Sequence, residues 1–287
     1  MLPPLKTLSK SYSFTATIAL ILLVASCGRK TVVNPSKPSS KLSTQAILGY
    51  PSLTTGNASA DGSEYLLVKP QYVLSYQPLK GIARWVGWHL QTSDLGSADR
   101  QDDFRPDEDL PRNFTMIKPT DYTNSGFDRG HLCPSGDRTA TESDNSATFV
   151  MSNMIPQAPS LNRGIWSDLE DYCRTKVKLG SEAYIYAGGY GEGGKGSNGS
   201  ANTIASGKVS VPNRCWKVIL IMPQGDNDVS RVGTEKVEVI AVNMPNSQDV
   251  AGTSWRKWQV TVHELERTTG LDFFSELPQS VQDKIEN

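Results

Sequence analysis

Residues 126–138 read GFDRGHLCPSGDR, and at their centre an acid, a fixed cation, a glycine and an imidazole occupy the four positions from Asp128 to His131. The whole chain contains only three histidines. Turns collect Gly, Asp and Arg, so this tetrapeptide alone does not establish a functional site. Its meaning depends on the chemistry that the rest of the chain places around it.

A helical pattern begins about thirty residues later and covers residues 161–179. Its apolar side chains repeat every four residues and predict a buried stripe: Leu161, Ile165, Leu169, Cys173 and Val177. A second stripe with the same spacing lies one step round the helix: Asn162, Trp166, Glu170 and Arg174. Singly, these residues could be a helix cap, a core residue and an exposed ion pair. Together they place an amide oxygen, a carboxylate and a guanidinium along one ridge.

The remaining patterns predict an α+β fold. Runs rich in β-branched and aromatic residues, bounded by Gly, Pro or Asn, indicate strands over residues 71–76, 82–90, 183–187, 217–222 and 237–244. Helical patterns cover residues 141–154, 161–179 and 262–269. We therefore expect an antiparallel β-sheet core flanked by helices.

The N-terminal residues have the layout of a secretory signal. Lys6 and Lys10 precede an apolar run over residues 14–25 that is too short to span a bilayer. The following Val-Ala-Ser-Cys, residues 24–27, resembles the lipobox of bacterial lipoproteins, in which the cysteine is acylated. We expect an exported protein, periplasmic or at the cell surface, held on a bacterial membrane only through a lipid on Cys27. Cleavage without lipid would instead give a secreted protein.

The chain then divides into a linker and a domain. Residues 1–26 are the expected signal peptide, and residues 27–63, rich in Ser, Thr, Pro, Asn and Gly, are expected to form a lipid-anchored flexible linker. Residues 64–287 are long enough for one domain with a substantial core.

Charge and cysteine content restrict the function further. The formal net charge is −1, which argues against coating of nucleic acid by bulk attraction, because such proteins are usually basic. A polyanionic substrate must therefore meet a local patch. The three cysteines of the domain, Cys133, Cys173 and Cys215, leave open one disulfide with a free thiol, or packed thiols, and their spacing disfavours a zinc site. In residues 188–199, Gly196 follows Lys195 where a P-loop requires Ser or Thr, so this glycine-rich segment predicts a flexible loop.

Four ordered segments carry a family resemblance: SADRQDDFRPD (97–107), DRGHLCPSGDR (128–138), MSNMIPQ (151–157) and NRGIWSDLEDYCR (162–174). Over about residues 65–286 the chain resembles the DNA/RNA non-specific endonuclease family, with the ββα-metal (His-Me finger) fold, and above all its secreted cyanobacterial sugar-non-specific members. The resemblance implies a Mg²⁺- or Mn²⁺-dependent endonuclease that hydrolyses single- and double-stranded DNA and RNA with little sequence preference. It also implies 5′-phosphate products and a protein inhibitor as a partner.

Transferred position by position, the resemblance gives the central residues their roles. It implies that His131 is the general base and that Asn162 is the direct protein ligand of the metal ion. Glu170 would hold water bound to that ion. Mg²⁺ prefers oxygen ligands and keeps several waters, so one amide oxygen is an adequate protein contribution.

The same transfer assigns the phosphate contacts. Arg100 and Arg174 would bind the scissile phosphate and stabilise its transition state, because a guanidinium stays charged and offers a planar fork. Arg129 would contact substrate, and Asn153 would support the substrate site beside it. Asp128 would orient its neighbours.

A hypothesis of another class is a lipid-anchored envelope protein that keeps this fold without catalysis and only binds nucleic acid or a protein partner. Metal-dependent degradation of nucleic acid that requires His131 would separate the enzyme from this binding protein.

Overall fold

The computed structural model describes residues 1 and 4, residues 42–52 and residues 63–287. The expected signal peptide, the lipobox and Cys27 lie outside the described residues, apart from Met1 and Pro4. Among the residues that are described, no helix has both the length and the apolar character needed to cross a bilayer.

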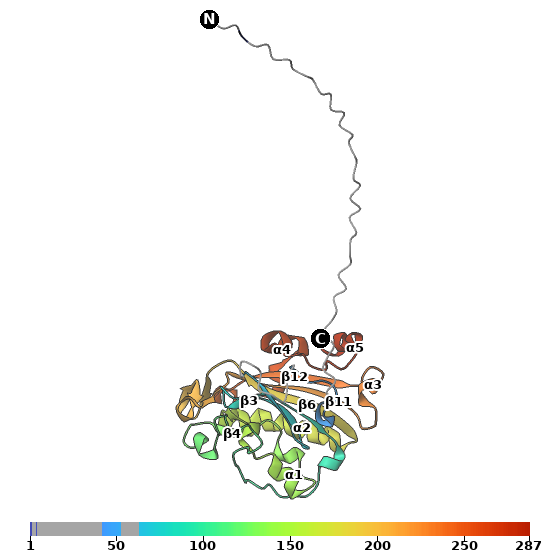
Figure 1. Ribbon diagram of the computed structural model, residues 1–287. Coiled ribbons are helices and arrows are strands. Elements are labelled where there is room, and N and C mark those ends of the chain that lie inside the picture. Colours follow the sequence, from blue (N-terminus) through green and yellow to red (C-terminus); the bar gives the residue numbers. More distant parts are fainter. Residues whose placement is uncertain (2–3, 5–41, 53–62) are drawn as a thin grey trace. The chain divides into compact units, whose positions relative to one another are not determined.

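A seven-stranded antiparallel sheet forms the centre of the domain, with the strand order β1-β2-β3-β6-β11-β12-β13 (Figure 1). Its strands are β1 (Tyr65–Val68), β2 (Val73–Gln77), β3 (Ile82–Leu90), β6 (Ser181–Tyr190), β11 (Arg214–Pro223), β12 (Glu238–Pro245) and β13 (Gln259–Val260). All five predicted strands are present, and their ends differ from the prediction by at most three residues. The short edge strands β1 and β13 carry too little pattern to be predicted.

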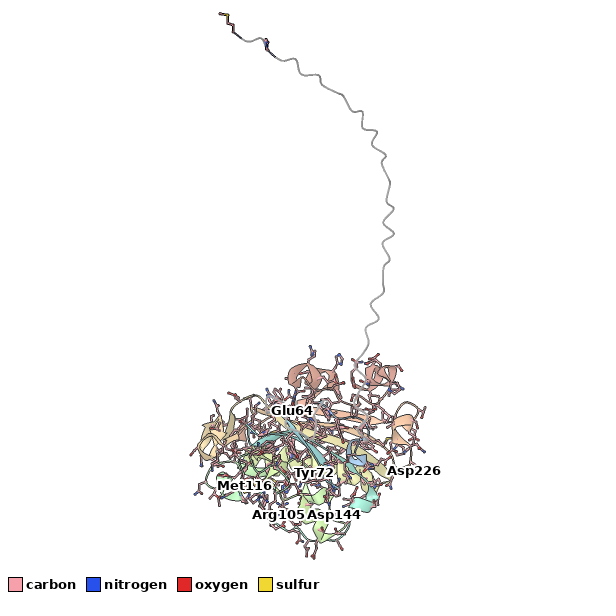
Figure 2. All side chains as sticks on the ribbon, in the orientation of Figure 1. Glu64, Tyr72, Arg105, Met116, Asp144 and Asp226 are labelled. Atoms are coloured by element: carbon pink, nitrogen blue, oxygen red, sulfur yellow. The ribbon has the colours of Figure 1, made fainter. Side chains whose placement is uncertain are left out.

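Helices cover both faces of the sheet, and this explains why β3 and β11 are buried almost throughout (Figure 1). On one face, Trp88 and Ile185 pack in a core cluster with Leu169 of α2 (Ser167–Lys178). On the other face, Trp85 and Trp216 share a cluster with α4 (Val262–Thr269). Figure 2 shows Tyr72 within the body of the domain and Asp226 at its periphery, in agreement with their burial.

The DRGH stretch forms a strand of its own. Strand β4 (Asp128–His131) pairs antiparallel with β5 (Met154–Gln157), which places His131 opposite Met154. Gly130 is required in this pairing, because a Cβ there would lie 2.1 Å from Oε1 of Gln157. Helix α2 follows β5 along the chain, so the paired strands β4 and β5 and the helix α2 give the expected combination of two strands and a helix.

The predicted helix over residues 141–154 is wrong beyond its first half. Helix α1 (Glu142–Ala147) is followed by a 3-10 turn, η5 (Met151–Asn153), and then by β5. Between them the backbone pairs with Arg105, whose N–H donates to Phe149 O at 3.1 Å and whose carbonyl accepts from Met151 N at 2.9 Å. This tertiary pairing overrides the local helical pattern.

The predicted helix over residues 161–179 is confirmed, with an irregular first turn. The π-helical segment η6 (Leu161–Trp166) leads into α2, and Gly164 has non-helical torsion angles of φ −114° and ψ −115°. The five apolar residues of the predicted stripe are all buried. Single π-turns of this kind are frequent at functional sites.

The other elements are short. The helices α3 (Asp228–Arg231) and α5 (Gln279–Ile285) and the hairpins β7 (Gly194–Gly196) with β8 (Gly199–Ala201) and β9 (Thr203–Ile204) with β10 (Val209–Ser210) complete the regular structure. The 3-10 turns are η1 (Thr44–Ala46), η2 (Thr92–Asp94), η3 (Pro119–Tyr122), η4 (Ser135–Asp137), η7 (Ala205–Gly207), η8 (Gln248–Val250) and η9 (Trp255–Trp258). The expected flexible loop over residues 188–199 is thus partly strand.

Residues 42–52 belong to the folded unit, although they lie within the predicted linker over residues 27–63. Ala46 and Leu48 are fully buried. The hydroxyl of Tyr186 donates to Gly49 O at 2.7 Å. The domain boundary expected at residue 64 is therefore too late, because the small apolar cluster at residues 46–48 is a core element; the described residues do not cover the rest of the linker.

Candidate active site

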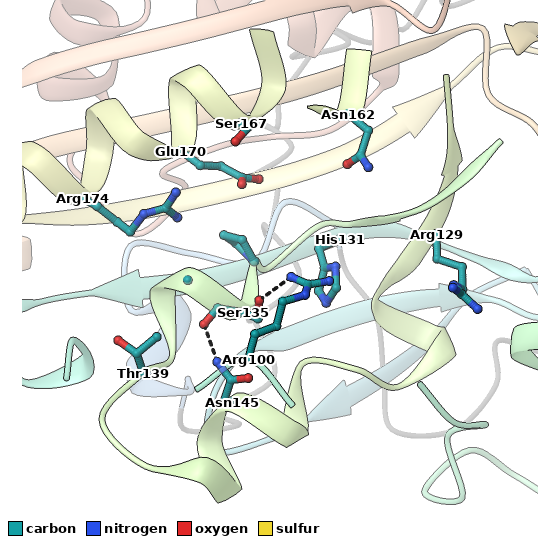
Figure 3. Close-up of a pocket in the computed structure, with 12 residues that line it drawn as sticks. Arg100, Arg129, His131, Ser135, Thr139, Asn145, Asn162, Ser167, Glu170 and Arg174 are labelled. Carbon is teal, nitrogen blue, oxygen red and sulfur yellow. Dashed lines mark hydrogen bonds between the residues drawn. The ribbon is translucent and has the colours of Figure 1, made fainter. Parts of the chain in front are cut away.

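A cavity of about 410 Å³ lies between the helical segments η6 and α2 and the segment that carries His131 (Figure 3). Six of the residues singled out in the sequence line this cavity: Arg100, Arg129, His131, Asn162, Glu170 and Arg174. Figure 3 shows Asn162, Glu170 and Arg174 along one wall, with His131 on the facing wall. The ridge predicted from the four-residue spacing therefore faces the DRGH strand.

His131 is an almost fully buried imidazole. Its ring lies edge-on to Phe149, with ring centroids 4.9 Å apart, and its Nε2 atom has no hydrogen-bond partner among the described residues. The pKa of His131 is lowered to about 3, mainly by burial and also by the positive charges of Arg100 and Arg129. The imidazole is therefore neutral at neutral pH, as a proton acceptor must be.

Asn162 is held with a defined orientation. Its Nδ2 donates to Oδ2 of Asp128 at 2.9 Å, so its Oδ1 is the atom turned toward the cavity (Figure 3). Asp128 is fixed in turn by Arg163, which donates from Nε and Nη2 at 2.8 and 2.7 Å. Asp128 therefore holds the amide of Asn162 and does not itself line the cavity.

Glu170 is paired with Lys217, which was not among the predicted site residues. Nζ of Lys217, on β11, donates to Oε1 of Glu170 at 2.8 Å, and the lysine side chain is only 2% exposed. The same Nζ lies 4.1 Å from the ring centroid of Trp166. Burial raises the pKa of Glu170, and the charge of Lys217 opposes that rise. Lys217 therefore favours the ionised form of a carboxylate that faces the cavity.

Arg174 is held by two carboxylates. Its Nη1 donates to the buried Asp137 at 2.8 Å, and its Nη2 donates to Asp171 at 2.5 Å. Asp137 also accepts from Nε1 of Trp88 at 2.9 Å, which ties it to the sheet. Gly136 leaves space for the guanidinium, because a Cβ at that position would lie 2.9 Å from Nη1 of Arg174.

The other two arginines rest on aromatic rings. The guanidinium carbon of Arg100 lies 4.9 Å from the ring centroid of Phe149, and Nη1 donates to Ser135 Oγ at 2.9 Å. The guanidinium of Arg129 lies 4.2 Å from the ring centroid of Phe104. Ring contacts of this kind orient a cation without neutralising it. Arg100 also forms an ion pair, because its Nε donates to Oδ1 of Asp102 at 2.7 Å. With Arg174, the two arginines give the cavity three guanidinium groups on a chain whose net charge is slightly negative.

Asn153, which was predicted to support the substrate site, makes its hydrogen bonds with the backbone. Asn153 is fully buried and does not line the cavity. Its Nδ2 donates to the carbonyls of Cys133 and Thr148, and its Oδ1 accepts from Cys133 N at 3.0 Å. The amide is therefore used to hold the backbone next to His131, which is a supporting role.

Sequence reasoning missed Lys217 and Asp137. Lys217 had a usable signal, since it is the one charged residue within the apolar strand of residues 215–222. A buried lysine needs a paired acid, so its position alone predicts a partner. Asp137 ends the GFDRGHLCPSGDR stretch beside Arg138 and has the composition of an ordinary turn. Only the fold shows that its side chain points back to the helix.

The three cysteines that the structure describes are free, buried thiols: Cys133, Cys173 and Cys215. Burial raises the pKa of Cys173 and of Cys215 to about 12. These thiols therefore behave as small core residues, one of the two arrangements that the sequence left open.

The cavity has the chemistry to hold a hard divalent cation. The oriented amide oxygen of Asn162 and the carboxylate of Glu170 both face it, and oxygen ligands are those that Mg²⁺ and Mn²⁺ prefer. A second group of metal-binding side chains, His89, Glu182 and Asp228, lies outside the cavity. Arg231 already supplies a positive charge to those carboxylates, because it donates to Glu182 and Asp228 at 3.2 and 2.8 Å.

This chain is similar to known nucleases in sequence and in fold. A family model described as DNA/RNA non-specific endonuclease matches residues 51–280. A nuclease of Nostoc sp. is 42% identical over 271 residues, which cover 94% of this chain and 95% of that protein. Nuclease C1 of Cunninghamella echinulata is 36% identical over 75% of this chain and 84% of its own length.

A solved structure, described as the EndoG/EndoGI complex, is similar in fold. It has a TM-score of 0.67 and 29% identity, and the match covers 82% of this chain and 91% of the matched chain. The family match spans most of the folded domain and includes every residue that lines the cavity. On these grounds the chain belongs to the DNA/RNA non-specific endonuclease family.

Proposed function

We propose that this protein hydrolyses the phosphodiester backbone of both DNA and RNA, with Mg²⁺ or Mn²⁺ as its cofactor, and leaves 5′-phosphate ends. The observation that carries the proposal is the convergence of a neutral imidazole, an oriented amide oxygen, an acid and three arginines on one cavity. Phosphodiester hydrolysis requires an activated water, compensation of charge on the phosphate and stabilisation of the departing oxygen. Different side chains of this cavity can meet each requirement.

His131 is the proposed general base. It is neutral at neutral pH, its ring is wedged against Phe149, and its backbone carbonyl accepts a hydrogen bond from Trp166 Nε1 at 3.3 Å. A phosphate bound between Arg100 and Arg129 would offset the two positive charges that lower the pKa of His131. Bound substrate would therefore raise the pKa of His131 and make it a stronger base. A positioned general base contributes roughly 10²- to 10⁴-fold to the rate.

Arg100 and Arg174 are proposed to bind the scissile phosphate. Both guanidinium groups line the cavity and are held by other side chains, so little freedom is lost when phosphate binds. Their charge is permanent, and it compensates the negative charge that develops on the phosphate oxygens. Arg129 also lines the cavity and would contact a neighbouring part of the nucleic-acid strand.

Asn162 and Glu170 would hold the cation, Asn162 through its amide oxygen and Glu170 through water. When bound, a divalent cation stabilises the charge that develops on the leaving oxygen. The role of Asp128 is to keep the amide of Asn162 from rotating, and the role of Lys217 is to keep Glu170 ionised. Both roles can be tested separately from the chemistry.

Weak sequence preference follows from the kind of groups in the cavity. Arginines that contact phosphate position a strand but do not distinguish bases. A sugar-phosphate linkage is common to DNA and RNA, so both are expected substrates. The alternative of a protein that only binds nucleic acid would leave the neutral His131 without a purpose.

The test uses supercoiled plasmid and a single-stranded RNA with the purified chain, first with Mg²⁺ or Mn²⁺ and then with EDTA. The proposal expects metal-dependent degradation of both, with 5′-phosphates that a phosphatase removes. Binding without cleavage under both metals would reject it in favour of the non-catalytic protein. Cleavage of only one of the two polymers would reject the lack of sugar preference.

A protein inhibitor is a further proposed partner. The similar EndoG structure is a complex with EndoGI, and in this chain three arginines face the cavity. An inhibitor that presents carboxylates would match them. Competition between such an inhibitor and a short duplex, lost in Arg100→Gln, would support this partner, and undiminished duplex binding would oppose it.

Export and lipid anchoring are proposed from the N-terminal residues alone. The apolar run and the lipobox-like Val-Ala-Ser-Cys are the support. Labelled fatty acid should enter the protein in a bacterial host, and Cys27→Ser should abolish the labelling. Labelling that persists in Cys27→Ser would contradict the anchor at this residue.

A further inference from the structure

The two C-terminal helices bring together a cluster of possible metal ligands on the side of the sheet away from the cavity. Figure 1 shows α4 and α5 on that side, with α2 and β4 on the other. His263 lies in the first turn of α4, Glu266 lies one turn later, and Glu286 directly follows α5. One ligand atom from each of these three residues lies within 4.8 Å of the others.

Glu286 contributes a carboxylate oxygen to this cluster from a buried position. The residue is only 4% exposed, and its Oε1 has no hydrogen-bond partner in the part of the chain that the structure describes. Its backbone is fixed on both sides, because its carbonyl accepts from His263 N at 3.1 Å and its N–H donates to Gln282 O at 3.0 Å. A buried acceptor left unpaired is costly, so its placement by ordered backbone requires an explanation.

The charges around Glu286 favour a cation. Glu286 is buried, and the nearby carboxylates of Glu266, Asp272 and Asp283 disfavour a further unpaired negative charge there. Of the described residues, His263 contributes a basic group to the cluster, with its Nδ1 3.4 Å from Oε2 of Glu266. A divalent ion would supply the positive charge and the missing partner together.

We propose that His263, Glu266 and Glu286 form a second, structural metal site that binds Zn²⁺ or a similar divalent transition ion. Imidazole nitrogen and carboxylate oxygen are both ligands that Zn²⁺ takes in proteins, with metal–ligand distances of about 2.0–2.2 Å. Tetrahedral ligands at those distances are about 3.4 Å apart. Nδ1 of His263 and Oε2 of Glu266 already have this separation, and a ligand atom of Glu286 lies within 4.8 Å of the other two residues. The side chain of His263 is 65% exposed and free to adjust its position.

The ion would link Glu286, which follows α5, to His263 and Glu266 of α4. It would thus stabilise the face of the sheet that does not carry the catalytic groups. The other His-acid cluster, at His89 and Glu182, does not offer such a site, because Arg231 already occupies the acid. The cluster at His89 and Glu182 therefore already contains a cation, the guanidinium of Arg231, whereas a bound metal ion would supply the cation of the cluster at Glu286.

The experiment uses the full-length chain with Asn162→Ala, so that the proposed ligand in the cavity is removed. The metal-free protein is titrated with Zn²⁺ by calorimetry, and its Tm is measured with and without Zn²⁺. We expect one equivalent of Zn²⁺ to bind and to raise the Tm. His263→Ala and Glu286→Gln should each weaken binding more than tenfold and abolish the rise in Tm.

Asp283→Asn is the matched control, because Asp283 is an exposed neighbouring acid outside the ligand set. Its Zn²⁺ affinity should change less than threefold. His263 is exposed, so its variant should fold whatever happens to Glu286→Gln. Absence of Zn²⁺ binding, or binding that is unchanged in His263→Ala, would overturn the proposal, and neither result would affect the nuclease assignment.

Discussion

Lys217 donates a hydrogen bond to Glu170 at 2.8 Å, and this pair joins the central strand β11 to the helix that lines the cavity. Its lysine is almost completely buried, and its carboxylate is 12% exposed. Such a pair is a weak source of net stability, but the loss of one partner leaves an uncompensated charge. Lys217 therefore affects both the stability of the fold and the ionisation of Glu170.

Lys217→Met should lower the free energy of unfolding at neutral pH by about 3–5 kcal/mol, because Glu170 is left buried without its cation. Chemical denaturation measures this change. The double variant Lys217→Met with Glu170→Gln should recover much of the stability and still lack nuclease activity. A double variant no more stable than Lys217→Met would show that the lysine acts through another contact.

Asp128→Ala should raise the concentration of Mg²⁺ or Mn²⁺ needed for half-maximal activity by about 10- to 100-fold, the effect usual for a residue that orients a metal ligand. The cause is loss of the hydrogen bond that fixes the amide of Asn162. Arg163→Ala is the control, since it removes a partner of Asp128 and leaves that hydrogen bond in place. An equal effect of both variants would contradict this role for Asp128.

Gly136→Ala should lower kcat by up to about 10²-fold with little change in Tm, because the new Cβ would push the Arg174 guanidinium from its place. Steady-state kinetics on plasmid measures the effect. In an Arg174→Ala background the same substitution should have no further effect on kcat. Additive losses would mean that Gly136 acts independently of Arg174.

The stability of the protein should fall in mild acid through His131. The pKa of this residue is about 3 in the folded protein and 6.5 as its ordinary value, so only the unfolded chain takes up the proton between those limits. The free energy of unfolding should therefore decrease by about 1.4 kcal/mol for each pH unit below 6.5 from this group. His131→Gln should show a correspondingly smaller decrease between pH 6.5 and pH 4.5 in denaturant titrations. Equal slopes would mean that His131 is accessible to protons in the folded state.

Local sequence patterns predicted the regular parts of the molecule well. The strand over residues 82–90 and the helix that begins at residue 161 have strong periodicity, and the structure has both. The segment after Ala147 could not be predicted, because its backbone pairs with Arg105, more than forty residues away along the chain. Periodicity carries no information about such a partner.

The cavity was predictable where family motifs covered it, and incompletely elsewhere. Asn162, Glu170 and Arg174 could be grouped because helical spacing places them on one face. The motif predicted that Asn153 supports the substrate site, but it did not show that its amide bonds to the backbone of Cys133 and Thr148. Burial of a polar side chain depends on tertiary packing, which motif position does not reveal.

The most direct test of the account is the single-turnover cleavage rate of a short DNA duplex and of an RNA of matched length, for the wild type and His131→Ala. Both are measured at saturating Mg²⁺ or Mn²⁺, with circular dichroism as the check on folding. The account predicts that folded His131→Ala loses roughly 10²- to 10⁴-fold in rate on DNA and on RNA alike. Retention of the wild-type rate on either polymer would contradict it.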